Sequence, residues 1–143
     1  MTGLAASLAL ALALLPQPSL EIHDAWVRQT SSVLTVSNGY FRIDNHTAAP
    51  IALIRVVVDG ARNAELHTVV DDNGRTIMKP LARLSVPARG SVTLAPGATH
   101  LMVTDVTRPF RVGAHVRLTL TFDNHQTRTV QAIVRPLDAV SVK

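Results

Sequence analysis

Two residues in the last third of the chain, His100 and Met102, carry side chains that can bind soft metal ions. Leu101 separates them, in an apolar segment that is typical of a β-strand. Side chains at positions i and i+2 of a strand point to the same face of a sheet. The imidazole and the thioether are therefore predicted to lie side by side, with Leu101 on the opposite face.

A second pair, His67 and Met78, depends on the hairpin predicted between them. If the four turn residues Asp71–Gly74 form the loop, His67 faces Met78 directly. If Asn73-Gly74 forms a two-residue turn instead, His67 pairs with Pro80, and Met78 lies diagonally on the same face. Both registers place the pair on one face, whereas a loop of odd length would separate them.

These four side chains together offer two imidazole nitrogens and two thioether sulfurs. Thioether favours Cu(I) and imidazole tolerates it, whereas zinc gains little from methionine and calcium requires oxygen ligands. The pattern predicts a Cu(I) site made of His67, Met78, His100 and Met102. Taken singly, a methionine more often fills a core and a histidine more often lies at the surface. The prediction depends on both internal methionines standing in matching positions to a histidine.

The composition excludes several other kinds of site. The sequence has no cysteine, which removes disulfides, thiolate zinc sites, iron–sulfur clusters, cysteine nucleophiles and the usual blue-copper site. The formal net charge of +4 comes from arginines scattered singly, and aromatic residues make up only 3%. A basic stripe and a stacking platform are both missing, so no nucleic-acid partner is expected. No Gly-x-Ser-x-Gly or His-Glu-x-x-His pattern occurs, so the sequence offers neither of these catalytic motifs.

The first twenty residues differ in kind from the rest. Leu4–Leu15 is an uncharged run of Ala, Ser and Leu, followed by the proline-broken stretch Pro16–Ser19. Twelve apolar residues are too few to span a membrane but suit the core of a signal peptide. We interpret residues 1–20 as a signal peptide or leader, with a buried apolar helix as the alternative. A periplasmic or secreted protein is expected, with membrane tethering through the leader as a further option.

Residues 21–143 are predicted to form one all-β domain, an antiparallel sandwich or barrel. Segments rich in Val, Ile, Thr and Leu recur about every ten residues between turn residues, which is typical of such folds. The predicted strands are Glu21–Arg28, Val36–Asp44, Ile51–Val58, Ala64–Val70, Arg75–Pro80, Gly90–Leu94, His100–Thr104, Val116–Asp123 and Arg128–Arg135.

The spacing His67-x10-Met78-x21-His100-x-Met102 resembles that of the periplasmic copper chaperones of the PCuAC type. The resemblance covers nearly all of residues 21–136 and extends to the segments around the four residues. These segments are Ile22–Arg28, Gly39–Phe41, Ala64–His67, Gly97–Met102 and Leu118–Phe122.

The resemblance implies a cupredoxin-like fold and a copper carrier rather than an enzyme. The expected acceptor is a copper subunit of a respiratory oxidase or a second copper chaperone, with no small-molecule substrate. Family members often have further methionines where this chain has Thr68 and Thr76, and some have His- and Met-rich tails, which Leu137–Lys143 lacks. One Cu(I) per chain is therefore expected. The protein is also expected to be a monomer.

The sequence leaves two other functions open. A copper oxygenase could use His23 at a mature N-terminus, or His23 could bind Cu(II) there. The chain could also be a structural or adhesive sandwich in which the four residues are incidental, because sandwich folds serve many functions. His46 and His125 fall in predicted turns and are expected to be solvated, and His115 is assigned no role.

Overall fold

The chain folds into ten β-strands in a computed structural model that describes residues 19–140. The strands are β1 (Leu20–Arg28), β2 (Ser37–Asn45), β3 (Ile51–Val58), β4 (Ala61–Asp72), β5 (Arg75–Pro80), β6 (Leu84–Val86), β7 (Ser91–Thr93), β8 (His100–Val106), β9 (His115–Phe122) and β10 (Thr127–Arg135). Nine of them match the predicted segments within a few residues at each end. The short strand β6 has no counterpart among the predicted segments. The all-β class is therefore confirmed.

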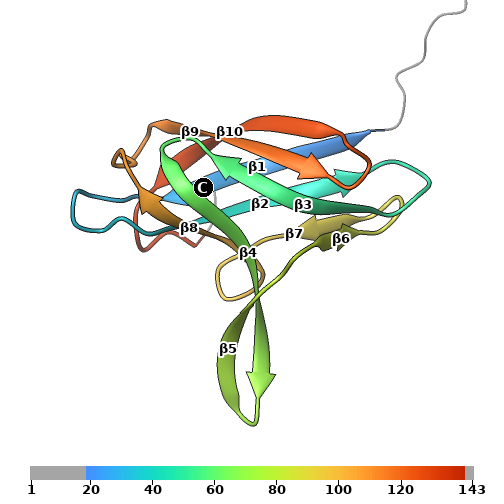
Figure 1. Ribbon diagram of the computed structural model, residues 1–143, viewed down its shortest axis with the longest axis horizontal. Helices are drawn as coiled ribbons and strands as arrows, with labels where there is room; N and C mark the ends of the chain where they lie inside the picture. Colours follow the sequence, from blue (N-terminus) through green and yellow to red (C-terminus); the bar gives the residue numbers. More distant parts are fainter. Residues whose placement is uncertain (1–18, 141–143) are drawn as a thin grey trace, which may run out of the picture.

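The strands form one continuous, strongly curved sheet in the order β5-β4-β8-β2-β1-β10-β9-β3-β6, with β7 also paired to β2. Figure 1 shows how the sheet folds over on itself, and β3 contacts β4, the strand that follows it in the chain. The pair β1 and β10 is parallel, and the other pairs between described strands are antiparallel. The cupredoxin-like fold is thus a mixed sheet, rather than the fully antiparallel one that local patterns predict.

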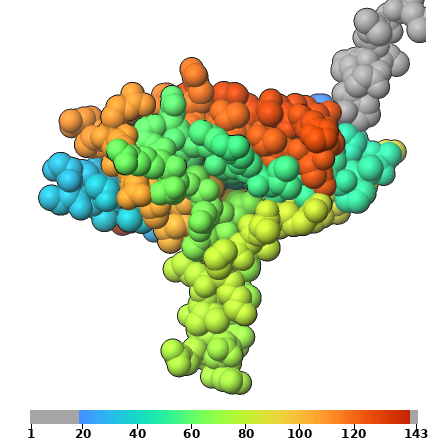
Figure 2. Space-filling view, in the orientation of Figure 1, coloured from blue at the N-terminus to red at the C-terminus, as the bar shows by residue number. Residues whose placement is uncertain are grey.

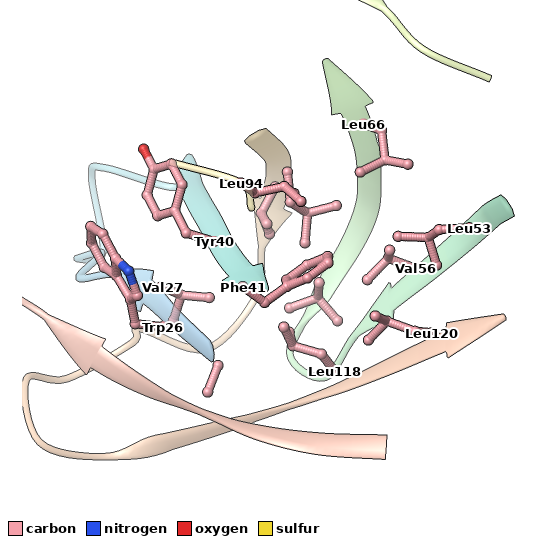
Figure 3. Close-up of a cluster of buried hydrophobic side chains, with 14 of the residues drawn as sticks. Trp26, Val27, Tyr40, Phe41, Leu53, Val56, Leu66, Leu94, Leu118 and Leu120 are labelled. Atoms are coloured by element: carbon pink, nitrogen blue, oxygen red, sulfur yellow. The ribbon is translucent and has the colours of Figure 1, made fainter. Parts of the chain in front are cut away.

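The core lies between the two halves of this folded sheet. In β9, Val116, Leu118, Leu120 and Phe122 are all buried, as the alternation of apolar and polar residues indicates. Figure 3 shows Leu118 and Leu120 on the same side of their strand as the Phe41 ring, with Leu53, Val56 and Leu66 around them. Because the aromatic content is low, aliphatic side chains make up most of this core.

The hairpin of β4 and β5 projects away from the body of the molecule (Figures 1 and 2). Its tip is a two-residue turn in which Asn73 and Gly74 both have positive φ, 51° and 81°. This is the turn type that Asn-Gly favours in hairpins, because its twist matches that of the flanking strands. The Asp71 carboxylate accepts a hydrogen bond from the Gly74 amide at 2.9 Å and holds the turn closed.

Strand β1 carries a bulge between His23 and Trp26, where the register with β2 shifts. Asp24 sits at the bulge with φ 55°, a conformation that Asp tolerates better than most residues. After the bulge, Trp26 lies opposite Tyr40, with 4.4 Å between the two ring centroids. The bulge therefore sets which β1 side chains share a face with which β2 side chains.

The leader predicted over residues 1–20 falls mainly on residues 1–18, which lie outside the described residues. Leu20 already belongs to β1 and is 2% exposed, and the Ser19 carbonyl accepts a hydrogen bond from the His46 amide. The leader boundary at residue 20 thus stays a prediction. Within residues 19–140, no helix is long and apolar enough to cross a membrane.

Candidate metal centre

His67 of β4 and His100 of β8 lie directly opposite each other in the sheet. Their ring centroids are 5.7 Å apart and the ring planes are inclined by 49°. The alternate residues Leu66 and Leu101 are also paired and are buried in the core. Because strand side chains alternate between faces, both imidazoles point to the face away from the core.

The ring of His100 is buried, with the residue only 5% exposed. Its Nδ1 lies 2.8 Å from the carbonyl oxygen of Ala98. A carbonyl only accepts hydrogen bonds, so Nδ1 carries the proton and Nε2 of the neutral ring has a free lone pair. This Nε2 is buried and has no hydrogen-bond partner among the described residues.

His67 shows the same arrangement with its two nitrogens exchanged. Its Nε2 lies 3.2 Å from the Glu65 carboxylate, which accepts the hydrogen bond when ionised. Glu65 is two residues earlier in β4 and so lies on the same face. The Nδ1 atom is buried and without a partner among the described residues, although the side chain as a whole is 16% exposed.

Two buried imidazole lone pairs without partners therefore occur on adjacent strands. Leaving one buried acceptor unsatisfied costs about 1–3 kcal/mol. A metal ion bound to both nitrogens would remove that cost. Hydrogen bonds from the second ring nitrogen to a carboxylate or a backbone carbonyl are the usual way in which proteins orient histidine ligands.

Met102 lies two residues after His100 on β8 and opposite Glu65, so its side chain shares the face of the two imidazoles. It is partly buried. Its place beside His100 follows from strand alternation alone, as the sequence predicts.

Met78 lies on β5 opposite Val69, while His67 pairs with Pro80. This is the register that follows from a two-residue Asn73-Gly74 turn, and it places Met78 diagonally from His67 on the same face. Met78 is 58% exposed, which makes it the most accessible of the four residues. The structure thus brings the two imidazoles together and places both methionines on their face.

The orienting contacts of Glu65 and of the Ala98 carbonyl are not among the features that the sequence predicts. For Glu65 a signal exists, because the pattern Glu-x-His places a carboxylate on the same strand face as the imidazole. For Ala98 no such signal exists, because a backbone carbonyl can belong to any residue.

The remaining histidines lie elsewhere. His115 and His125 are exposed, at the start of β9 and in the turn that follows it. His46 is half exposed and lies near the Glu21 carboxylate. His23 lies inside β1, so a mature N-terminus at His23 would remove the buried Leu20 and its pairing with β2. The position of His23 therefore argues against the copper oxygenase alternative.

The sequence matches the family "Putative lipoprotein LpqE-like" over residues 20–134. A relative, "Putative lipoprotein Lxx21020" from Leifsonia xyli subsp. xyli (strain CTCB07), is 26% identical over 117 residues, which cover 81% of this chain and 69% of that protein.

Solved structures of similar fold include Cu(I)-loaded DR1885 from Deinococcus radiodurans and the apo PCuAC domain of PmoF2. The first is 28% identical, has a TM-score of 0.67, and the match covers 87% of this chain and 83% of that one. The second is 24% identical and has a TM-score of 0.72, and the match covers 86% of this chain and 94% of that one. The resemblance to PCuAC proteins is confirmed, and with its match over residues 20–134 the chain belongs to the LpqE-like family.

Proposed function

We propose that this protein is a copper chaperone of the PCuAC type. In the proposal it binds one Cu(I) with His67, Met78, His100 and Met102 and passes the ion to a copper acceptor outside the cytoplasm. The observation that carries the proposal is the pair of buried ring nitrogens, His67 Nδ1 and His100 Nε2, which have no partner among the described residues. Both rings are held by hydrogen bonds through their other nitrogen, so the free lone pairs are fixed in place.

The chemistry of the donor set selects the metal and its oxidation state. Two thioethers and two imidazoles form a soft set, which favours Cu(I) over Zn(II) and over divalent ions that require oxygen ligands. The set contains no thiolate, because the chain has no cysteine. A thiolate-rich acceptor would then bind Cu(I) more tightly than this site does, which gives transfer a thermodynamic direction.

The exposure of the site supports transfer rather than storage. Met78 is 58% exposed on the projecting hairpin, whereas His100 is 5% exposed. An acceptor could therefore reach the metal from the hairpin side without unfolding the sheet. A catalytic copper centre would need an open coordination position for a substrate, whereas four protein ligands complete the shell of a carried ion.

Relatives support the same proposal for cargo and location. The structure of DR1885 at 28% identity is that of its Cu(I) form. The lipoprotein descriptions of the family and of the Leifsonia relative, together with the apolar leader in the sequence, support a periplasmic or secreted protein, with tethering through the leader as the alternative. The proposed acceptor is a copper subunit of a respiratory oxidase or a second copper chaperone, and the proposed oligomeric state is a monomer.

The test is a Cu(I) titration of the purified domain against a competing chromogenic chelator, combined with X-ray absorption at the copper edge. We expect one Cu(I) per chain and a first shell that contains both sulfur and nitrogen. His100→Gln should abolish tight binding, and the matched control His125→Gln, an exposed turn residue, should bind as the wild type does. A first shell of nitrogen and oxygen alone, or equal affinity in both variants, would refute the proposal.

A further inference from the structure

A second group of metal-ligating side chains lies on the outer face of β1 and β2. Glu21 and Asp44 are directly paired across the two strands, on the face opposite the buried Ile43. His23 is two residues beyond Glu21 on β1, so strand alternation places it on the same face. His46 follows the end of β2, and its ring approaches the Glu21 carboxylate.

The ligand atoms of these residues lie close together. His23 Nε2 is 3.0 Å from Glu21 Oε2 and 3.2 Å from Asp44 Oδ2. His46 Nε2 is 3.4 Å from the same Glu21 oxygen. One ligand atom each from Glu21, Asp44 and His46 lie within 4.8 Å of one another.

These separations match the edges of a tetrahedral metal shell. With metal–nitrogen and metal–oxygen bonds of about 2.0–2.2 Å, tetrahedral geometry places neighbouring ligand atoms roughly 3.3–3.6 Å apart. Of the three nitrogen–oxygen distances in the cluster, 3.4 Å lies in that range, and 3.2 and 3.0 Å are slightly shorter. An ion at the centre of the group would therefore lie within reach of Glu21, Asp44 and His46, with His23 next to both carboxylates.

The backbone and the neighbouring side chains hold the cluster in position. The amide of His46 donates a hydrogen bond to the Ser19 carbonyl and so continues the pairing of β1 with β2 past the end of the strand. Arg42 Nε donates to Asp44 Oδ1 at 3.1 Å and Arg42 Nη2 donates to Asp44 Oδ2 at 3.4 Å, so one guanidinium orients both oxygens of this carboxylate.

The charges of the cluster suit a dication. Glu21 and Asp44 supply two negative charges, and Arg42 is partly balanced by Asp24, 3.5 Å away. A hydrogen bond from the Ser91 side chain lowers the pKa of the Asp44 carboxyl below its ordinary value, and Arg42 makes a smaller contribution in the same direction. Hydrogen bonds from the two histidines lower the pKa of Glu21 in the same way. Both carboxylates are therefore ionised at neutral pH and available to a cation.

We propose that Glu21, His23, Asp44 and His46 bind one divalent transition-metal ion. Two imidazoles and two carboxylates form a borderline nitrogen–oxygen set, which suits Cu(II) and Zn(II) and contains no sulfur to favour Cu(I). The order of divalent affinities places Cu(II) above Zn(II) for such a set. The chain would thus have two metal sites that differ in the oxidation state of the copper they select.

The second site is independent of the proposed Cu(I) site. The two share no residue, and they lie at opposite ends of β2: β8 pairs with residues 37–39, whereas Asp44 lies in the half that pairs with β7. The second site therefore does not depend on the chaperone function. Loss of one site should leave the other intact.

The test uses the purified chain, one metal at a time, and NMR of the histidine rings. Zn(II) is added first because it is diamagnetic and redox-inert, and the ring signals of His23 and His46 are expected to shift at one equivalent. Cu(II) is then added, and electron paramagnetic resonance should show hyperfine coupling to two imidazole nitrogens. Affinities are compared for wild type, His23→Gln, His46→Gln and the control His125→Gln.

We expect His23→Gln and His46→Gln each to weaken Zn(II) binding by at least about tenfold, since even loss of an outer-shell partner has that effect. His125→Gln should leave the Zn(II) affinity unchanged. A thermal melt of each variant without metal shows whether the variant is folded. If a histidine variant does not fold, Asp44→Asn replaces it. The proposal is overturned if Zn(II) shifts only His67 and His100, if both histidine variants bind as the wild type does, or if neither ion binds. In that last case the four residues form only an ion-paired cluster.

Discussion

Replacing Met78 or Met102 by leucine separates a ligand role from a packing role. Met78→Leu and Met102→Leu conserve volume and apolar character but remove the lone pairs that would bind Cu(I). If the two methionines fill space, leucine replaces them and copper binding persists. If they are ligands, tight binding of Cu(I) is lost while the fold survives.

The expected magnitudes follow from the exposure of each side chain. Met78 is 58% exposed, and a surface substitution of this kind changes the free energy of unfolding by about 0.5 kcal/mol or less. Met102 is partly buried, and a volume-conserving swap there should cost less than about 1.5 kcal/mol. Copper should stabilise the wild type by about 4 kcal/mol when free Cu(I) is about 1,000 times the Kd. This corresponds to roughly 15 °C in Tm for a domain of this size.

The assay is a set of thermal melts with and without Cu(I) under reducing conditions. Copper should raise the Tm of the wild type, and the copper-induced rise should be much smaller in both leucine variants. Without copper, the three proteins should melt within a few degrees of one another. Copper-dependent stabilisation that persists unchanged in both variants would mean that the metal binds elsewhere, and the proposed ligand set would be wrong.

Three further predictions test the surroundings of the site and the fold. Glu65→Gln weakens the hydrogen bond that orients His67, so Cu(I) affinity in a chelator competition should fall about 10–100-fold, and an unchanged affinity would argue against this positioning role. Gly74→Ala should lower the free energy of unfolding, measured in urea, by about 1 kcal/mol. An added Cβ would meet no atom within 4 Å, so only the strain of the positive φ remains. Asn45→Ala should cost about 2–4 kcal/mol by the same measurement, because its buried amide donates to three carbonyl oxygens, and a loss below about 1 kcal/mol would contradict that reasoning.

The hairpin around Asn73-Gly74 shows what local sequence can predict. The sequence leaves two registers open, and both place Met78 on the face of His67. The two-residue turn in the structure selects the register that pairs His67 with Pro80. The His100–Met102 relation follows from strand alternation in the same way. Both relations join residues that are close together in the chain, so turn chemistry and strand alternation are enough to predict them.

Features that depend on distant segments could not be predicted in this way. His67 pairs with His100, which lies 33 residues further along the chain, and the parallel pairing of β1 with β10 joins the two ends of the domain. The strand β6 is only three residues long, too short for any alternation to be visible. The contact of His46 with Glu21 likewise needs the β1–β2 register, so the sequence alone indicates only a solvated turn histidine.

The projecting hairpin gives the proposed ligands an order of access. Met78 is largely open to solvent, while His100 is almost fully enclosed. An incoming acceptor thiolate would therefore displace the thioether of Met78 first, while both imidazoles still hold the ion. Copper would pass through a species bound by donor and acceptor at once and would never be released as a free ion. Exchange of this kind is associative, so its rate should rise with acceptor concentration rather than match the spontaneous dissociation rate of the copper.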